Sequence, residues 1–299
     1  MLALSLPSMR PLLLALLVLS AASPMAQTTF RTVPEGPSVS IDALVALGDD
    51  TESLWTDQNG VSLGSSTLET TTSALLLAGR FPIGRVTIVA ELPFAYVSYN
   101  QSLGDVAPPI DASDTALGNP YLGLAVQSGL VEIEGGVRLP LASQETPPLD
   151  AFSADAVIAA FTLDPERFEA YAVDVFTATL AARTRVELVP GVRAEFRLAP
   201  ALVVETQDAP ADNASILALG YGLQLAADAG PLAVHGGVIG RRFFSADRYS
   251  LFDVDATVVL GARFVRAPVQ PGVLVRVPVS DDYFGTDAVV GLSLDVPLR

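Results

Sequence analysis

The stretch that decides the fold is RVTIVAELPFAYV, residues 85–97. Apolar side chains occupy every second position of this stretch: Val86, Ile88, Ala90, Leu92, Phe94 and Tyr96. Polar or small residues occupy positions between them: Arg85, Thr87, Glu91 and Pro93. Because successive side chains of a β-strand point to opposite faces, this alternation predicts a strand with one apolar and one polar face.

The same alternation recurs along the chain, separated by turn residues. It predicts strands near 38–47, 69–81, 85–97, 118–127, 131–141, 174–188, 191–206, 214–227, 231–244, 252–265, 272–280 and 286–297. Twelve strands are expected, with about ten or fourteen as the alternatives. Residues 154–161 interrupt the series, and we expect a short helix there in an external loop, or else an extra strand.

The connections between these strands alternate in length. Short turns containing Pro or Gly lie near residues 82, 129, 190, 229 and 268. Longer polar segments lie near 48–68, 98–117, 142–172, 207–213, 245–251 and 281–285. Short turns at one end and longer loops at the other are typical of outer-membrane barrels, whose turns are periplasmic and whose loops are external.

Composition agrees with a membrane barrel. Half of the residues are hydrophobic and the mean hydropathy is +0.45, yet no run after residue 26 approaches the roughly 18 apolar residues of a membrane helix. We therefore predict an all-β fold, a transmembrane antiparallel up-and-down β-barrel of about 12 strands over residues 38–299. A soluble secreted β-sandwich is the alternative, because it also alternates apolar and wet positions.

The N-terminus predicts export. Arg10, the apolar run 12–19 and the small residues 21–26 form the pattern of a cleaved signal peptide over residues 1–26. Residues 27–37 would then be a periplasmic N-terminal segment. The predicted location is the cell outer membrane, and the predicted partners are outer-membrane lipid and the barrel assembly machinery. The chain ends in Leu298-Arg299, not in the aromatic residue common in such barrels.

Charged residues of one parity are predicted to line the interior. They are Arg80, Arg85, Glu91, Glu132, Glu134, Arg138, Arg183, Arg185, Glu187, Arg193, Glu195, Arg197, Asp253, Asp255, Arg263, Arg276 and Asp295. Arg and carboxylate side chains on neighbouring strands can form bidentate hydrogen bonds that tie the wall together. The alternative role is a charged lining that selects solutes, as rings of charges do in other pores.

Several other classes of site are not expected. The formal charge of −16 argues against nucleic acid, and the absence of cysteine removes disulfides, thiolate nucleophiles and cysteine metal sites. Acidic residues in the predicted loops form no calcium-loop pattern and are interpreted as a solvated face; they include Asp49, Asp50, Glu52, Asp57, Asp105, Asp111 and Asp114. No metal and no cofactor is therefore predicted.

The single histidine, His235, lies on a predicted strand. It could serve a nucleophilic serine in an outer-membrane lipid hydrolase, which would need serine two residues away on the same face. Residue 237 is glycine. The sequence therefore predicts that the protein is not an enzyme.

Aromatic residues fall mostly near predicted strand ends, where interfacial girdles or ordinary barrel packing would place them. They are Phe81, Phe94, Tyr96, Tyr99, Tyr121, Phe196, Tyr221, Phe243, Phe244, Phe252, Phe264 and Tyr283. Glycines within strands are expected to allow a curved sheet to bend or two backbones to approach.

Two short motifs resemble a known family. The run LGNPYLG at 117–123 and the run GVRLPL at 136–141 resemble outer-membrane transporter-like β-barrels of the phenol meta-pathway group, over residues 70–141. The resemblance implies passage of small, often hydrophobic or aromatic, molecules, and it supplies no catalytic residues. The expected function is a channel or transporter gated by external loops, particularly 142–172. The alternative is a sealed structural or adhesion barrel without transport, and the solute is unknown.

Overall fold

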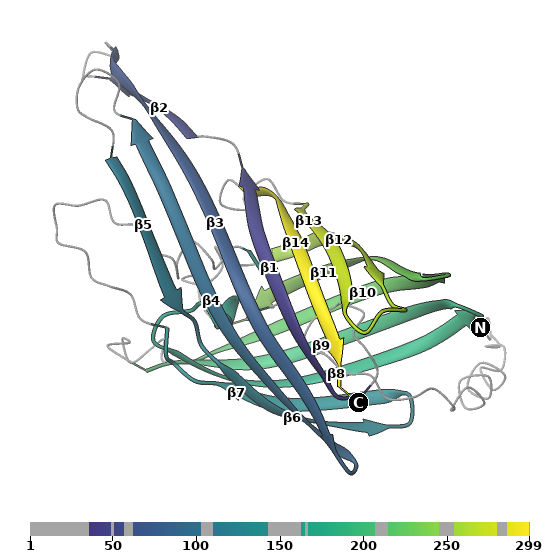
Figure 1. Ribbon diagram of the computed structural model, residues 1–299. Helices are drawn as coiled ribbons and strands as arrows, with labels where there is room; N and C mark the ends of the chain where they lie inside the picture. The colour runs from purple at the N-terminus through teal and green to yellow at the C-terminus, as the bar shows by residue number, and fades with distance from the viewer. Residues whose placement is uncertain are drawn as a thin grey trace, which may run out of the picture.

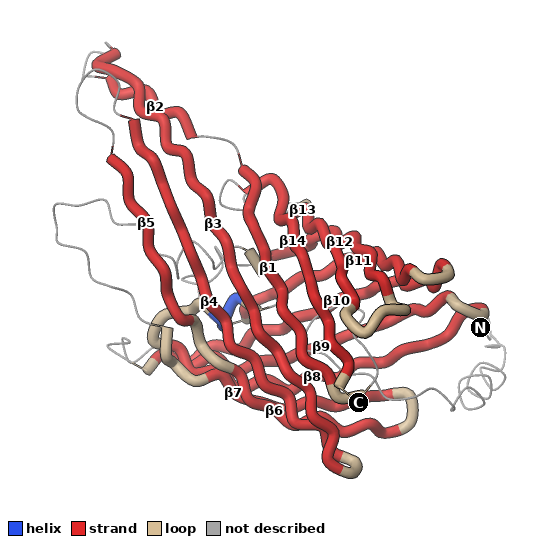
Figure 2. The backbone as a smooth tube through the Cα atoms, viewed as in Figure 1, coloured by secondary structure: helices blue, strands red, loops and turns tan. Residues whose placement is uncertain are grey.

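A computed structural model describes residues 36–48, 51–56, 62–102, 110–142, 163–164, 167–206, 215–244, 254–279 and 286–298. The predicted signal peptide at 1–26 and the predicted helix at 154–161 lie outside the described residues, as does nearly all of 27–37. The described chain is almost entirely β-strand (Figure 2).

Twelve strands close into one antiparallel barrel (Figure 1). They are β1 (Ser38–Gly48), β3 (Ser62–Ile83), β4 (Val86–Ser102), β6 (Tyr121–Ser128), β7 (Val131–Arg138), β8 (Val175–Val189), β9 (Val192–Glu205), β10 (Ser215–Ala229), β11 (Leu232–Phe243), β12 (Val254–Phe264), β13 (Gln270–Pro278) and β14 (Thr286–Pro297). Each strand pairs with its neighbours in sequence, and β1 pairs with both β3 and β14 to close the ring. The predicted fold class and the number of barrel strands are confirmed.

Two additional strands correct the prediction for the first two long loops. β2 (Thr51–Thr56) pairs with the upper part of β3, and β5 (Ile110–Leu117) pairs with the upper part of β4. They flank the part of the β3–β4 hairpin that extends beyond the other strands (Figure 1). These segments were predicted as parts of acidic loops, whereas pairing with the ladders of β3 and β4 makes them strands.

The outward side chains explain why the sheet closes into a membrane barrel. Burial alternates along the strands, and the outward positions are apolar: Leu122, Leu124, Leu180 and Leu198 are each 55–58% exposed. A soluble sandwich would bury such a continuous apolar face, because soluble proteins rarely expose large contiguous apolar patches. The outer surface is therefore suited to lipid.

The short turns lie at one end of the barrel, as predicted. Glycine is needed in several of them for conformation, because Gly84 and Gly191 have φ angles of 64° and 80°, a region that other residues rarely adopt. These turns set the register in which each hairpin places its polar residues on the inner face.

Two of the aromatic residues near predicted strand ends point inward. Tyr121 is 5% exposed and Phe243 is 7% exposed. The ring of Tyr121 lies where a Cβ atom on Gly136 would come within 2.3 Å of its hydroxyl oxygen, and that hydroxyl donates to Glu134 Oε1 at 2.8 Å. The glycine leaves room for an aromatic ring, so here the interpretation as ordinary barrel packing is the correct one.

Candidate functional site

The predicted interior charges are mostly buried in the barrel. Eleven of the seventeen are buried: Arg80, Glu91, Glu132, Glu134, Arg138, Arg183, Glu195, Arg197, Arg263, Arg276 and Asp295. Arg185 and Arg193 are partly buried, while Arg85 and Glu187 are exposed near the short turns. Asp253 lies outside the described residues, as does the side chain of Asp255 in β12. The structure thus brings most of the set together and leaves Arg85 and Glu187 outside it.

One group of these charges joins β3 to β7 near the turn end. Arg80 lies 3.6 Å from a carboxylate oxygen of Glu132 and 3.5 Å from one of Glu134. All three side chains are no more than 8% exposed. Burial of an isolated guanidinium would be costly, so the two carboxylates are what allow Arg80 to point inward.

A second group joins β8 to β9. Arg183 and Arg197 are paired directly across these strands, which places two like charges side by side. Glu195 offsets this repulsion, because its carboxylate lies 2.9 Å from Arg183 Nε and 2.6 Å from Arg185 Nη2. The wall therefore carries a mixed-charge surface in which a carboxylate neutralises more than one arginine.

Two further pairs differ sharply in exposure. Arg263 Nη1 lies 3.0 Å from Asp295 Oδ2, with side chains 6% and 1% exposed. Arg193 Nη2 lies 2.9 Å from Asp228 Oδ1, with side chains 27% and 45% exposed. The first pair is therefore shielded from solvent in the interior, and the second lies at the solvent-exposed edge of the interior.

Residues 163–164 and 167–172, which we call the strap, lie inside the barrel. This corrects the prediction that 142–172 is an external loop, as far as its described part is concerned. The strap contains the short 3₁₀ helix η1 (Phe168–Ala170), drawn blue in Figure 2. Leu163, Ala170 and Tyr171 are no more than 3% exposed. Burial of these apolar groups and pairing of the strap charges with the wall favour the inward position.

Ion pairs hold the first part of the strap to three strands. Asp164 Oδ1 lies 3.1 Å from Arg276 Nη1 on β13, and Asp164 Oδ2 lies 2.8 Å from Arg167 Nε. Arg167 also lies 3.9 Å from Glu91 on β4 and 4.0 Å from Asp42 on β1. This first part of the strap thus adds one acid, Asp164, and one base, Arg167, to the charges of the wall.

The later part of the strap contacts the opposite wall. Glu169 Oε2 lies 2.6 Å from Arg241 Nη1 on β11, and the Arg241 guanidinium lies 4.3 Å from the centre of the Phe168 ring. Phe168 also meets Phe243 edge-on, with ring centres 5.0 Å apart. In the ring of twelve strands β4 and β11 are six strands apart in either direction, so the strap spans the interior.

The sequence reasoning missed six residues of this site. They are Asp42, Asn119, Asp164, Arg167, Glu169 and Arg241. Asp42 and Arg241 have inward parity on predicted strands and could have been found by the same alternation. The strap residues have no such signal, because LDPERFEAYA at 163–172 has the composition of an exposed loop.

The single histidine of the sequence, His235, lies on strand β11. His235 is partly buried, and its ring lies over Gly261, where a Cβ atom would come within 2.4 Å. Residue 237 is a glycine that leaves room for the backbone of β10. No cluster of metal-ligating side chains occurs among the described residues, and none of their helices is long and apolar enough to span a membrane.

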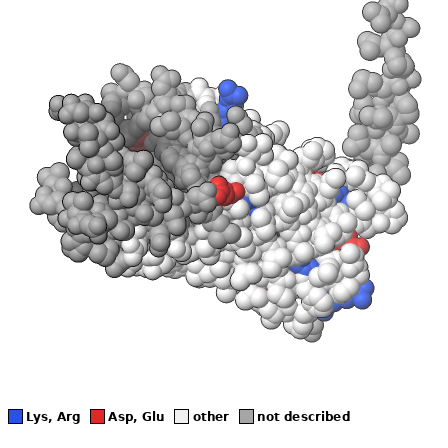
Figure 3. Space-filling view, turned by 90° about the horizontal axis from the view of Figure 1, so that it is seen from above, with Lys and Arg blue, Asp and Glu red and all other residues white. Residues whose placement is uncertain are grey.

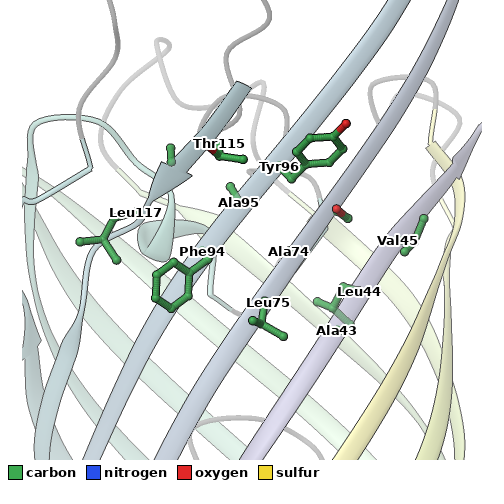
Figure 4. A pocket seen from close by; sticks show the side chains of 12 residues that line it. Ala43, Leu44, Val45, Ala74, Leu75, Phe94, Ala95, Tyr96, Thr115 and Leu117 are labelled. Atoms are coloured by element: carbon green, nitrogen blue, oxygen red, sulfur yellow. The ribbon is translucent and has the colours of Figure 1, made fainter. Parts of the chain in front are cut away.

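A pocket of about 700 Å³ crosses β1, β3, β4 and β5 (Figure 4). Its lining is apolar or hydroxylic, with Leu75, Phe94 and Tyr96 among the side chains that form it. The described surface in Figure 3 likewise shows few charges. Most of the predicted interior charges are buried in the barrel, several of them against the strap, which makes the strap and its wall the candidate site.

Comparison with known proteins supports the fold. No protein-family model and no curated protein matches the chain. The COG4313 outer membrane channel from Pseudomonas putida F1 is 12% identical, with a TM-score of 0.52 over 91% of this chain and 99% of that one. This likeness shows an outer-membrane β-barrel fold. Assignment to the phenol meta-pathway group stays a prediction.

Two other solved structures resemble the chain less closely. The β domain of the Bordetella autotransporter BrkA is 10% identical, with a TM-score of 0.47 over 88% of this chain and 100% of that one. The toluene transporter TodX of Pseudomonas putida is 9% identical, with a TM-score of 0.44 over 89% of this chain and 91% of that one.

Proposed function

We propose that this protein is an outer-membrane channel for small solutes, closed by the strap. The observation that carries this proposal is the strap itself: the element that spans the interior comes from a connecting segment and is held to the wall by ion pairs. A barrel that served only as a rigid structure would be as stable with apolar residues in these positions, because desolvation of buried charges offsets their attraction. Buried ion pairs between the strap and the wall are an advantage in a barrel whose interior opens to water, because the separated charges are then hydrated.

The proposed solutes are small molecules that combine an apolar body with a polar group. Near the strap the inner wall has apolar side chains, including Leu44, Ala95 and Val97, whereas the turn end has the mixed charges around Arg80 and Glu195. A solute would meet both surfaces in turn. Hydrophobic or aromatic molecules, which the family resemblance implies, fit the first of these surfaces.

The test is single-channel conductance of the refolded protein in a planar bilayer. Replacement of residues 164–171 by a short glycine–serine linker should convert rare, brief openings into a long-lived open state. Arg185→Ala should change the anion-to-cation preference of that state, because it leaves the carboxylate of Glu195 less neutralised. The exposed Arg85→Ala is the matched control, and its selectivity should equal that of the parent.

A sealed structural or adhesion barrel is the second candidate. The buried ion pairs that join neighbouring strands favour it, because they tie the wall together from inside. It predicts that the protein without its strap inserts as a heat-modifiable barrel yet carries no current. That result would reject the channel.

Acid should open the channel only well below neutral pH. Burial alone would raise the pKa of Asp164, but the positive charges of Arg167 and Arg276 outweigh it and lower the pKa from 3.8 to about 2. Because the folded pKa lies below the ordinary value, the contribution of this carboxylate to strap stability is fully present above about pH 4 and is lost as the pH falls toward 2.

We therefore expect equal closed-state conductance at pH 7 and pH 5, and a rise below about pH 3. Asp164→Asn should abolish this acid response, because the amide does not titrate. Among the described residues, Asp42 and Glu91 also face the strap and lie near Arg167, and the strap itself carries Glu169, which pairs with Arg241. An opening between pH 7 and 5 that persists in Asp164→Asn would show that another group controls the strap.

A further inference from the structure

We propose that Gly118 and Asn119 form a dedicated anchor for the strap, and that loss of this anchor releases the strap from the interior. This inference rests on the proposed function in one respect, namely that the strap closes the channel. The two residues belong to the motif LGNPYLG at 117–123, and the charge network makes no use of their side chains.

Asn119 binds the strap through both its side chain and its backbone. Its Nδ2 donates to the carbonyl oxygens of Glu169 at 3.0 Å and Ala172 at 2.6 Å. Its backbone N–H donates to the carbonyl of Ala170 at 2.6 Å. Asn119 is fully buried, so these carbonyls depend on protein donors for hydrogen bonding.

The other half of the same amide fixes Asn119 to the wall. Its Oδ1 accepts from the backbone N–H groups of Leu141 at 2.8 Å and Ala142 at 2.7 Å. One amide thus joins the segment after β7 to the end of the strap. Only an amide has both the donors and the acceptor that this position requires.

Gly118 gives the strap room to approach. A Cβ atom at this position would lie 2.3 Å from the carbonyl oxygen of Ala170 and 3.1 Å from Cδ1 of Tyr171. The φ angle of Gly118 is outside the left-handed region, so an alanine would fit the backbone itself. The clash would arise with the docked strap and with Pro93 Cγ at 2.9 Å.

The wall is interrupted where the anchor lies. β5 ends at Leu117 and β6 begins at Tyr121, and both pair with β4, on either side of Pro93. In this interval Gly118 N donates to the Pro93 carbonyl at 2.9 Å, while Asn119 N bonds to the strap instead of to β4. The backbone N–H of Asn119, between the two strands, thus turns from the sheet to the strap.

The absence of native cysteine allows a direct test on the full chain. A single cysteine is placed in the strap by Ala170→Cys or, as a second variant, Ala172→Cys. A reference cysteine is placed on β10 by Ala226→Cys, a buried position of the wall. In liposomes the rate of labelling by a water-soluble maleimide then reports exposure of the strap separately from exposure of the wall.

The anchor variants are Asn119→Asp, which removes the two side-chain donors but keeps an acceptor, and Gly118→Ala. The controls are Gly220→Ala, whose Cβ would be an ordinary 3.7 Å from Ala199, and Thr257→Val, which alters a buried hydroxyl of β12. Asn119→Ser is the substitute if Asn119→Asp does not insert, because it also loses the amide donors and introduces no charge.

Strap labelling should accelerate about tenfold or more in both anchor variants, because each loses or displaces buried hydrogen bonds. Labelling of the β10 cysteine and of both control variants should not change. If labelling accelerated equally at the strap cysteine and the β10 cysteine, Gly118 and Asn119 would stabilise the whole barrel. If the labelling rate of the strap did not change, the two residues would not anchor the strap. Either result overturns the proposal. Labelling requires no transport. If the barrel without its strap carried no current, that result would reject the channel function and leave the anchor proposal untouched.

Discussion

Glu91→Gln is expected to lower the free energy of unfolding of the barrel by about 3–5 kcal/mol, the cost of removing one partner of a buried ion pair. The Glu91 side chain is 1% exposed, and its Oε2 lies 2.5 Å from Arg138 Nη2. Its other oxygen lies 3.9 Å from Arg167. The neutral amide would leave the charge of Arg138 uncompensated, and that arginine cannot lose its proton to escape the penalty.

The measurement is the free energy of unfolding from urea titrations in detergent or lipid. The folded fraction is read from the different mobilities of folded and unfolded barrel in gels of unheated samples. Arg193→Gln is the matched control, because it breaks a pair of similar length at the exposed rim. Such surface pairs contribute about 0–1 kcal/mol. If Glu91→Gln and Arg193→Gln lowered the free energy of unfolding by similar amounts, Glu91 would not lie in a desolvated site.

Arg276→Gln and Arg241→Gln should each raise the open probability of the channel by about ten- to a hundredfold, and together by more than either alone. Arg276 binds both the carboxylate of Asp164 and the carbonyl of Leu163, each at 3.1 Å. Arg241 binds Glu169 and covers the ring of Phe168. The two arginines hold different parts of the strap from different strands, so their effects should combine.

Single-channel recording measures this effect, with Arg263→Gln as the matched control. Arg263 is as buried as Arg276 and pairs with Asp295 on the wall. Its replacement should destabilise the barrel without opening it. If all three variants raise conductance equally, opening reports general loosening of the wall, and the strap is not the gate.

The alternation of the sequence was sufficient to predict twelve barrel strands, because the pleat of a strand is a local property. Whether a residue such as Val86 or Glu91 lies on the outer or the inner face follows from its even or odd position in the strand, whichever strand lies beside it. Because the outward positions of a membrane barrel are apolar and many inward positions are charged, the two faces can be recognised from the amino-acid types. Residues 51–56 and 110–117 escaped prediction because their sequences, TESLWT and IDASDTAL, show no regular alternation of apolar and polar residues.

Parity also indicated which charges turn inward, and it would have included Asp42 and Arg241 had it been applied to every strand. It could not assign partners. Glu195 neutralises Arg183 and Arg185 because the β8–β9 register brings them together, and register depends on pairing across the sheet.

By itself, then, the sequence determined the strands, their faces and the membrane barrel that they form. Only the tertiary structure decided that part of an apparent external loop crosses the interior. Asp164 and Arg276 are separated by 112 residues in the chain and meet at 3.1 Å, and Asn119 meets the strap only because β5 and β6 part at residues 118–120. Such contacts depend on complementarity between distant segments, which no local periodicity records.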